Sequence, residues 1–218
     1  MKSHALKSSL STYYTYNGGN SSGANSASYT FASAPLGTAD NNRLIVAFAF
    51  VSGNNANLSD TTMTIGGVSA NRRIQAYSAG GEGISIFTLN VSSGTTASVV
   101  VTTNFGVNRC ALSLYSVYNL KDPERSNAFI YNPVSIGTDI GDELEAAITL
   151  DQRYGGVVIF GSGVFNNLTP PALPTYTWST SLGDTVTYDE IIRVGGEVNV
   201  FAIGSFEPKY TGSNTCLL

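Results

Sequence analysis

The chain has 218 residues, a formal net charge of -4 and only 12% charged residues. A negative net charge with few charged residues predicts no basic surface for phosphate groups, so we expect no nucleic-acid partner. No apolar run approaches the roughly 20 residues that span a bilayer, and residues 1–10 lack the continuous apolar segment of a signal peptide. We therefore expect no membrane insertion, and synthesis in the cytoplasm without an export signal.

The composition favours an all-β fold. Glycine contributes 23 residues, and tyrosine (12) and phenylalanine (10) dominate the aromatic residues. A chain of this length can bury a self-sufficient core, and few charges with many turn-forming residues suit a sandwich or barrel. Short apolar runs with turn signals between them predict an antiparallel β-sandwich, either a jelly roll or an Ig-like fold. We assign residues 28–218 to this single domain.

Residues 1–27 are predicted to form an extended polar arm. Tyr13, Tyr14 and Tyr16 lead into the polar stretch 17–23, which has no hydrophobic period. Fixing each residue of such a segment costs roughly 1–2 kcal/mol, which local contacts cannot offset. We therefore expect a neighbouring subunit or another partner to hold the arm, with the three tyrosines as its docking anchors.

The first strands of the domain are predicted from two patterns. Residues 29–34 alternate between apolar and small or polar side chains, as in a half-buried strand. Residues 43–51 form an almost unbroken apolar run, which is typical of a strand that is covered on both faces.

A hairpin is predicted next. Residues 62–65 and 68–70 are short β-like runs, and Gly66 and Gly67 lie between them. A type I′ turn requires positive φ at both central positions, which glycine adopts without strain.

Residues 84–117 contain three consecutive strand-like runs, which we interpret as an antiparallel meander. In the third run the side chains alternate between two faces. One face holds Cys110, Leu112, Leu114 and Ser116, and the other holds Arg109, Ala111, Ser113, Tyr115 and Val117. Both faces are mostly apolar or small, so we expect a central strand that is covered on both sides.

The carboxyl-terminal half is predicted to complete the same sandwich. Residues 119–132 are polar and are interpreted as a connection between its two halves. Residues 143–150 fit either a helix or a strand, and the strand is the better match. The further predicted strands are 155–161, 175–179, 185–192 and 198–203.

Catalytic chemistry has few candidates. The only histidine, His4, lies in the arm, so a serine or cysteine hydrolase triad is not expected, and transition-metal ligands are lacking. Paired carboxylates could serve a glycosidase, and loop oxygens could bind calcium. The acids are Asp139, Asp142, Glu143, Glu145, Asp184, Asp189 and Glu190, and the calcium candidates lie between Asp139 and Glu143. We favour solvated turns and strand ends, with no enzyme activity and no cofactor.

The cysteines and a group of aromatic residues leave alternatives open. Cys110 and Cys216 could form a disulfide, but two free thiols are the favoured interpretation in a chain without an export signal. Four aromatic residues at strand positions could form a platform for a sugar, or could belong to the core. They are Tyr77, Tyr115, Trp178 and Tyr188.

Several segments together resemble a recurrent pattern in surface proteins of tailed bacteriophages and of phage-like gene transfer particles. The segments are NRLIVAFAFV (42–51), TIGGVSA (64–70), ISIFTLNVSSGTTASVVVT (84–102) and RCALSLYSV (109–117), followed by GGVVIFG (155–161) and TYTWS (175–179). The resemblance covers roughly residues 28–205 and concerns strands and turns, so it assigns no site residue.

The resemblance implies a non-enzymatic structural virion protein, such as a head decoration, head spike or fibre-base protein. Such a protein would be made in the host cytoplasm and would lie on the particle surface. Its partners would be other virion proteins and further copies of itself. The alternatives are a carbohydrate-binding module that recognises a host-surface glycan and, third, a glycosidase.

Overall fold

The computed structural model describes residues 11–53, 58–77, 81–120, 147–152, 156–165, 179–183, 185–193, 199–208 and 212–217. This part of the chain contains strands and no helix, and two antiparallel sheets pack against each other as a sandwich. The all-β prediction is therefore confirmed. No described segment forms a helix that could cross a membrane.

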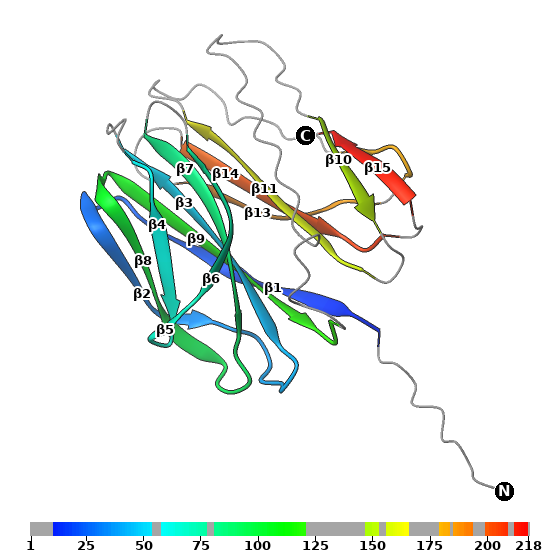
Figure 1. The fold of residues 1–218 in the computed structure, drawn as a ribbon, viewed down its shortest axis with the longest axis horizontal. Coiled ribbons are helices and arrows are strands. Elements are labelled where there is room, and N and C mark those ends of the chain that lie inside the picture. The colour runs from blue at the N-terminus through cyan, green and yellow to red at the C-terminus, as the bar shows by residue number, and fades with distance from the viewer. Residues whose placement is uncertain are drawn as a thin grey trace, which may run out of the picture.

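A jelly roll occupies the chain before residue 119 (Figure 1). Its strands are β1 (Tyr13–Ser22), β2 (Ser26–Pro35), β3 (Leu44–Ser52), β4 (Thr61–Ile65), β5 (Val68–Ser69), β6 (Asn71–Tyr77), β7 (Glu82–Asn90), β8 (Thr96–Val107) and β9 (Arg109–Tyr118). One sheet has the order β1-β9-β3-β7-β6, and the facing sheet has the order β2-β8-β4-β5. The pairings are nested, with β1 on β9, β2 on β8, β3 on β7 and β4 on β5. This nesting distinguishes a jelly roll from an Ig-like sandwich.

The predicted meander over residues 84–117 is wrong. β7 and β9 belong to the five-stranded sheet, whereas β8, which lies between them in the chain, belongs to the four-stranded sheet. The chain therefore crosses the sandwich after β7 and again after β8. Turn-forming residues mark where a strand ends, but burial of apolar faces decides which sheet the next strand joins.

β3 and β9 are central strands that are buried on both faces, as predicted. All nine residues of β3 are buried. On β9, Leu112 and Leu114 belong to the core between the two sheets, whereas Ala111 and Tyr115 belong to a second apolar cluster on the opposite face. The assignment of alternate residues of β9 to two faces is therefore confirmed.

The predicted glycine hairpin is confirmed as well. β4 and β5 pair through Thr64 with Ser69 and through Ile65 with Val68. The two linking residues, Gly66 and Gly67, have φ angles of 60° and 81°. A side chain with a Cβ would strain both positions, which explains the glycine pair.

The strand β1 replaces part of the predicted arm. It pairs antiparallel with β9 from Tyr13 opposite Tyr118 to Ser22 opposite Cys110. The prediction of a separate arm is therefore wrong for these residues. Backbone pairing needs no apolar period, and the tyrosines gain packing from residues that lie about a hundred positions away in the chain. Residues 1–10 of the predicted arm lie outside the described residues.

Arg43 holds together one end of the jelly roll. Its side chain is fully buried, and its guanidinium donates hydrogen bonds of 2.8–3.0 Å to six backbone carbonyl oxygens. The acceptors are Leu36, Gly37 and Thr38 in the loop before β3, and Val91, Ser93 and Gly94 in the loop after β7. Both loops are thereby fixed to the start of β3.

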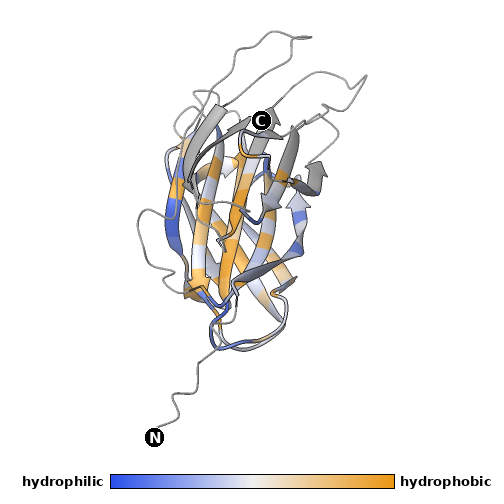
Figure 2. Ribbon diagram, turned by 90° about the vertical axis from the view of Figure 1, so that its right-hand side faces the viewer, coloured by the Kyte–Doolittle hydropathy of each residue, from blue (hydrophilic) through white to orange (hydrophobic). Residues whose placement is uncertain are grey.

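The strands after residue 146 form two further three-stranded sheets, one of which adds a third layer to the sandwich. They are β10 (Ala147–Gln152), β11 (Val158–Phe165), β12 (Ser179–Thr180), β13 (Thr187–Arg193), β14 (Asn199–Phe206) and β15 (Gly212–Leu217). The sheet β11-β14-β13 lies on the outer face of the five-stranded sheet. Ile203 of β14 and Ile159 of β11 pack there with Phe48 and Phe50 of β3. Figure 2 shows hydrophobic residues running along the strands in the middle of the molecule.

The predictions for the carboxyl-terminal half are met unevenly. β13 and β14 match the strands predicted at 185–192 and 198–203, and β10 supports the strand interpretation of 143–150 from residue 147 onward. Both sheets of the jelly roll are complete by Tyr118, so the expected connection between two halves of one sandwich is wrong. β15 was not predicted. The single domain over residues 28–218 stays a prediction.

Candidate functional site

Tyrosines from β1 and β9 gather on the outer face of the five-stranded sheet. The ring centroid of Tyr115 lies 5.0 Å from that of Tyr16 and 6.4 Å from that of Tyr14. Tyr115 is fully buried, and Phe48 meets its ring edge-on at a centroid distance of 6.1 Å. The structure therefore places two of the predicted docking anchors against a predicted platform residue, within the chain itself.

Hydrogen bonds join this tyrosine cluster to the third layer. Tyr115 Oη donates to Asp189 Oδ2 at 2.8 Å, and Ser205 Oγ donates to the same oxygen at 2.5 Å. Ser205 Oγ is also hydrogen-bonded to Tyr14 Oη at 2.9 Å. We call these four residues the seam, because they connect β1 and β9 of the jelly roll to β13 and β14.

The two seam tyrosines, Tyr14 and Tyr115, keep their phenol protons. Burial raises the pKa of Tyr115, and the neighbouring Asp189 carboxylate raises it further. Burial also raises the pKa of Tyr14, although the hydrogen bond with Ser205 acts in the opposite direction. Both phenols therefore stay neutral at physiological pH and keep their protons for hydrogen bonding.

The seam has the chemistry of a structural joint. A nucleophilic serine needs an adjacent base, and Asp189 instead uses one oxygen to accept bonds from both Tyr115 and Ser205. Tyr115 and Ser205 are both fully buried, which would keep a substrate from the hydroxyls. We therefore assign the seam to the packing of the third layer on the jelly roll.

The third predicted anchor, Tyr13, lies at the end of β1. Its ring stacks on that of Tyr118, with a centroid distance of 4.6 Å and an interplanar angle of 13°. Its side chain is 45% exposed, in contrast to the half-buried Tyr14 and Tyr16. Of the three predicted anchors, Tyr13 is therefore the most accessible to a partner.

The structure places two of the four predicted platform residues on opposite faces of the five-stranded sheet. Tyr77 lies on β6, at the opposite edge of the five-stranded sheet from β1, and packs against the core between the sheets. Tyr115 packs against the outer cluster on the other face. Trp178 and the side chain of Tyr188 lie outside the described residues. Tyr77 and Tyr115 cannot contact one sugar, so the platform fails for this pair.

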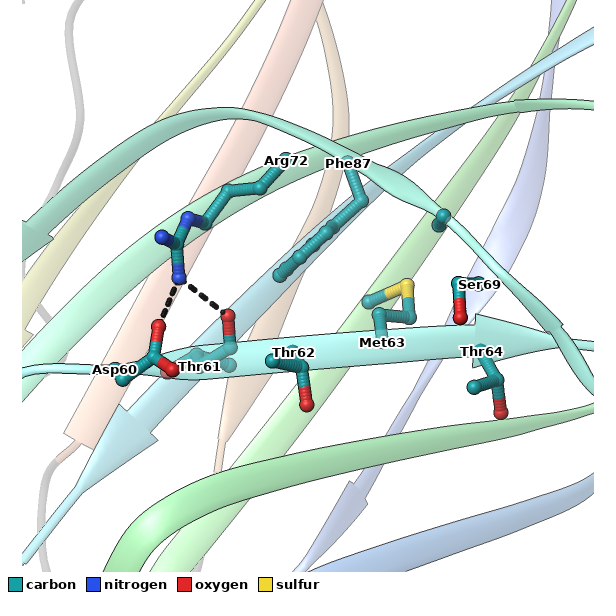
Figure 3. Close-up of a pocket in the computed structure, with 9 residues that line it drawn as sticks. Asp60, Thr61, Thr62, Met63, Thr64, Ser69, Arg72 and Phe87 are labelled. Carbon is teal, nitrogen blue, oxygen red and sulfur yellow. Dashed lines mark hydrogen bonds and ion pairs between the residues drawn. The ribbon is translucent and has the colours of Figure 1, made fainter.

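A groove beside β4 is a second candidate site (Figure 3). Its volume is about 480 Å³, and it is lined by Asp60, Thr61, Thr62, Met63, Thr64, Ser69, Ala70, Arg72 and Phe87. Arg72 forms an ion pair with Asp60 and donates to the carbonyl oxygen of Thr61 at 2.9 Å. Figure 3 shows Met63 and Phe87 on the same side of β4 as Arg72, whereas Thr62 and Thr64 point to its other side.

The groove offers limited binding chemistry. Arg72 and Asp60 are 39% and 50% exposed, so both can exchange their mutual bond for bonds to a ligand. Tyr77 lies nearby, because its hydroxyl is 2.6 Å from Thr61 Oγ1. Phe87 is only 1% exposed and cannot present a ring face. A small polar ligand fits this arrangement better than a stacked sugar ring.

The carboxylate candidates are only partly described. Asp139, Asp142, Glu143, Glu145 and Asp184 lie outside the described residues, and so does the side chain of Glu190. Asp189 belongs to the seam, where its Oδ2 accepts hydrogen bonds from Tyr115 and Ser205. Within the described part of the chain, no group of three or more potential metal ligands comes together.

Cys110 is a free thiol that is buried in the core. Burial raises its pKa well above the ordinary value, so the thiol stays protonated and unreactive. This agrees with the favoured interpretation of Cys110 as a small core residue. The side chain of Cys216 lies outside the described residues.

Sequence reasoning did not single out Arg43, the ion pair of Asp60 with Arg72, or Ser205. The sequence could have pointed to Arg43, because it is a single charged residue directly before a long apolar run. The other residues become partners only through strand pairing across the sandwich. Comparisons with protein-family models, with curated proteins and with solved structures find no match to this chain.

Proposed function

We propose that this chain is a non-enzymatic structural protein on the surface of a tailed phage or a phage-like gene transfer particle. The observation that carries the proposal is the jelly roll, an architecture shared by viral capsid and lectin domains. The resemblance in strands and turns points in the same direction.

The folded structure suggests a docking surface other than the predicted tyrosine anchors. Tyr14 and Tyr16 are half-buried against the chain's own sheet, so less of each side chain is left for a partner than at Tyr13. Docking by the buried parts of these two rings would require β1 to leave β9, which would expose Tyr115 and break the seam. We therefore assign docking to exposed strand edges and loops of the folded protein.

Purified particles from the strain that encodes the chain provide the test. We expect mass spectrometry to find the protein at a fixed copy number relative to the major capsid protein. Antibodies against the folded protein should label intact particles in electron micrographs. A chain that is abundant in the lysate but absent from purified particles would contradict the proposal.

A carbohydrate-binding module is the second candidate, because the groove places Arg72 donors and Asp60 acceptors where sugar hydroxyls could bind. A glycan array, read with and without calcium, is the test. Any glycan bound should be lost from Arg72→Met and Asp60→Asn variants. Thr30→Val, on the exposed face of β2, is the matched control and should bind normally. An array without binders would remove this candidate.

A further inference from the structure

Three of the four outer edges of the jelly roll carry features that oppose strand addition. β5 is only two residues long. β2 ends in Pro35, has Ser33 at a φ of 57° and shifts register twice against β8. β6 carries Arg72 and Arg73 and shifts register against β7. Short length, proline, bulges and charges are the means by which natural sheets avoid edge-to-edge pairing.

The fourth edge, β1, has few of these features. It is ten residues long, and its sequence YYTYNGGNSS contains no proline and no charged residue. Among the described strands, only β9 pairs with it, so it forms one edge of the five-stranded sheet. A single register shift, between Tyr16 and Gly18, interrupts the strand. Thr15 and Asn20, on either side of that shift, are exposed.

We propose that β1 is the surface on which a second copy of this chain binds, with the two β1 strands antiparallel across a twofold axis. An antiparallel pair of identical strands is self-complementary, because each copy presents the same donors and acceptors to the other. The uncharged edge avoids like-charge repulsion, although the chain carries a net charge of -4. Pairing joins the two five-stranded sheets into one continuous sheet.

This choice of partner follows from the symmetry of the edge. Main-chain hydrogen bonds would accept other extended strands as well, but a second copy supplies the same ten-residue uncharged strand in every molecule. The exposed Tyr13 lies near the outer end of the same strand and adds apolar area to the contact. Only the location of the dimer on a particle rests on the proposed function. The pairing itself is inferred from the properties of β1.

Sedimentation velocity of the full-length protein over a concentration series tests the proposal. We expect a reversible dimer in the unmodified protein. Thr15→Lys combined with Asn20→Lys places charges on the edge and should weaken association by at least about tenfold. Thr102→Lys is the matched control, since Thr102 is exposed on the central strand β8 of the other sheet, and it should leave the dimer unchanged. Circular dichroism should show all variants folded.

Two results would overturn the proposal. One is a protein that remains monomeric at its highest soluble concentration. The other is a dimer that persists unchanged in the Thr15→Lys, Asn20→Lys variant or in Thr15→Lys alone. Either result leaves the proposed function standing if the chain is still found in purified particles, so the two failures are distinguishable.

Discussion

The dipoles of backbone carbonyl groups stabilise the buried positive charge of Arg43. Removing a charge from water is costly unless its hydrogen-bonding groups are satisfied. Here six carbonyl oxygens in two loops surround the planar group, so each of its five N–H donors has an acceptor and the two on Nη1 are shared among three. A lysine has only three donors around one nitrogen and could not reach both loops equally well.

Replacing Arg43 with methionine should therefore be strongly destabilising. The change removes a donor from carbonyl groups of both loops, of which Leu36 and Thr38 keep bonds from Ser116 and Tyr118, and we expect a loss of at least about 3 kcal/mol in the free energy of unfolding. Arg43→Lys should recover only part of this loss. Urea denaturation provides the measurement. Arg72→Met is the control, because the exposed ion pair with Asp60 should contribute no more than about 1 kcal/mol. Equal effects at both sites would contradict the role of Arg43.

Ser113 and Leu114 test the burial of both faces of β9. Their exposures are 0% and 1%, and they point to opposite sides of the strand. We expect both Ser113→Asp and Leu114→Asp to abolish soluble expression, since a buried unpaired carboxylate costs several kcal/mol against a total of about 5–15. Ser113→Ala should be neutral or stabilising by up to about 1 kcal/mol, because its hydroxyl lacks a partner among the described residues. A well-folded Ser113→Asp variant would show that only one face of β9 is covered.

At the scale of strands, sequence patterns predicted those elements whose signal is local. The apolar run of β3, the positive φ angles at Gly66 and Gly67, and the two faces of β9 all follow from neighbouring residues. β1 could not be predicted in this way. Its polar sequence gains order from pairing with β9, which lies about a hundred residues away in the chain.

Gly161 shows how closely β11 approaches the jelly roll. A Cβ at this position would lie 3.2 Å from Phe50 Cζ and 3.3 Å from Phe48 Cδ1. These rings are buried and stacked, so they have little room to move. Glycine therefore permits the third layer to lie directly on two phenylalanine rings.

Gly161→Val should loosen the third layer without unfolding the jelly roll. We expect faster hydrogen exchange of backbone amides in β11, β13 and β14, with β3 and β8 still protected. Gly106→Ala in β8 is the matched control, because its Cβ would meet only the side-chain oxygen of Asn25, at 3.3 Å. Unchanged exchange in the Gly161→Val variant would mean that β11 does not lie tightly on Phe48 and Phe50.

Across the whole molecule, the candidate sites were harder to predict than the fold. The sequence suggested Tyr14 and Tyr16 as docking anchors and Tyr115 as a platform residue, but composition could not tell a docking surface from an interior seam. The difference arises because a third layer covers the outer face of the five-stranded sheet. That layer is built from strands that begin 40 or more residues after the end of β9, so local pattern carries no information about it.

Alkaline pH should weaken the whole fold through its buried phenols. Burial raises the pKa of Tyr29 from 10.0 to about 12 and also raises those of Tyr14, Tyr77 and Tyr115. Below pH 10 the folded and unfolded states both keep these protons, so stability is unaffected. Above pH 10 the unfolded state releases protons that the folded state retains, so stability falls. Tyr29 contributes a loss of about 1.4 kcal/mol per pH unit until the pH reaches its folded-state pKa of about 12.

Urea denaturation between pH 8 and pH 11 would measure this loss. Tyr29→Phe should be less stable at pH 8, because the single hydroxyl proton is shared between the backbone carbonyls of Ala24 and Val107, but its stability should fall less steeply above pH 10. An identical slope in the variant would show that Tyr29 titrates alike in both states.

The complete burial of β3 has a consequence for strand register. In a half-buried strand, a slip by one residue moves polar side chains into the core, so alternation itself fixes the register. The sequence LIVAFAFVS offers little such penalty, because apolar residues occupy both faces. Arg43 precedes this strand directly, and its bonds to two loops fix where β3 begins. Arg43 therefore fixes the register of β3, and with it which side chains of the strand face each neighbouring layer.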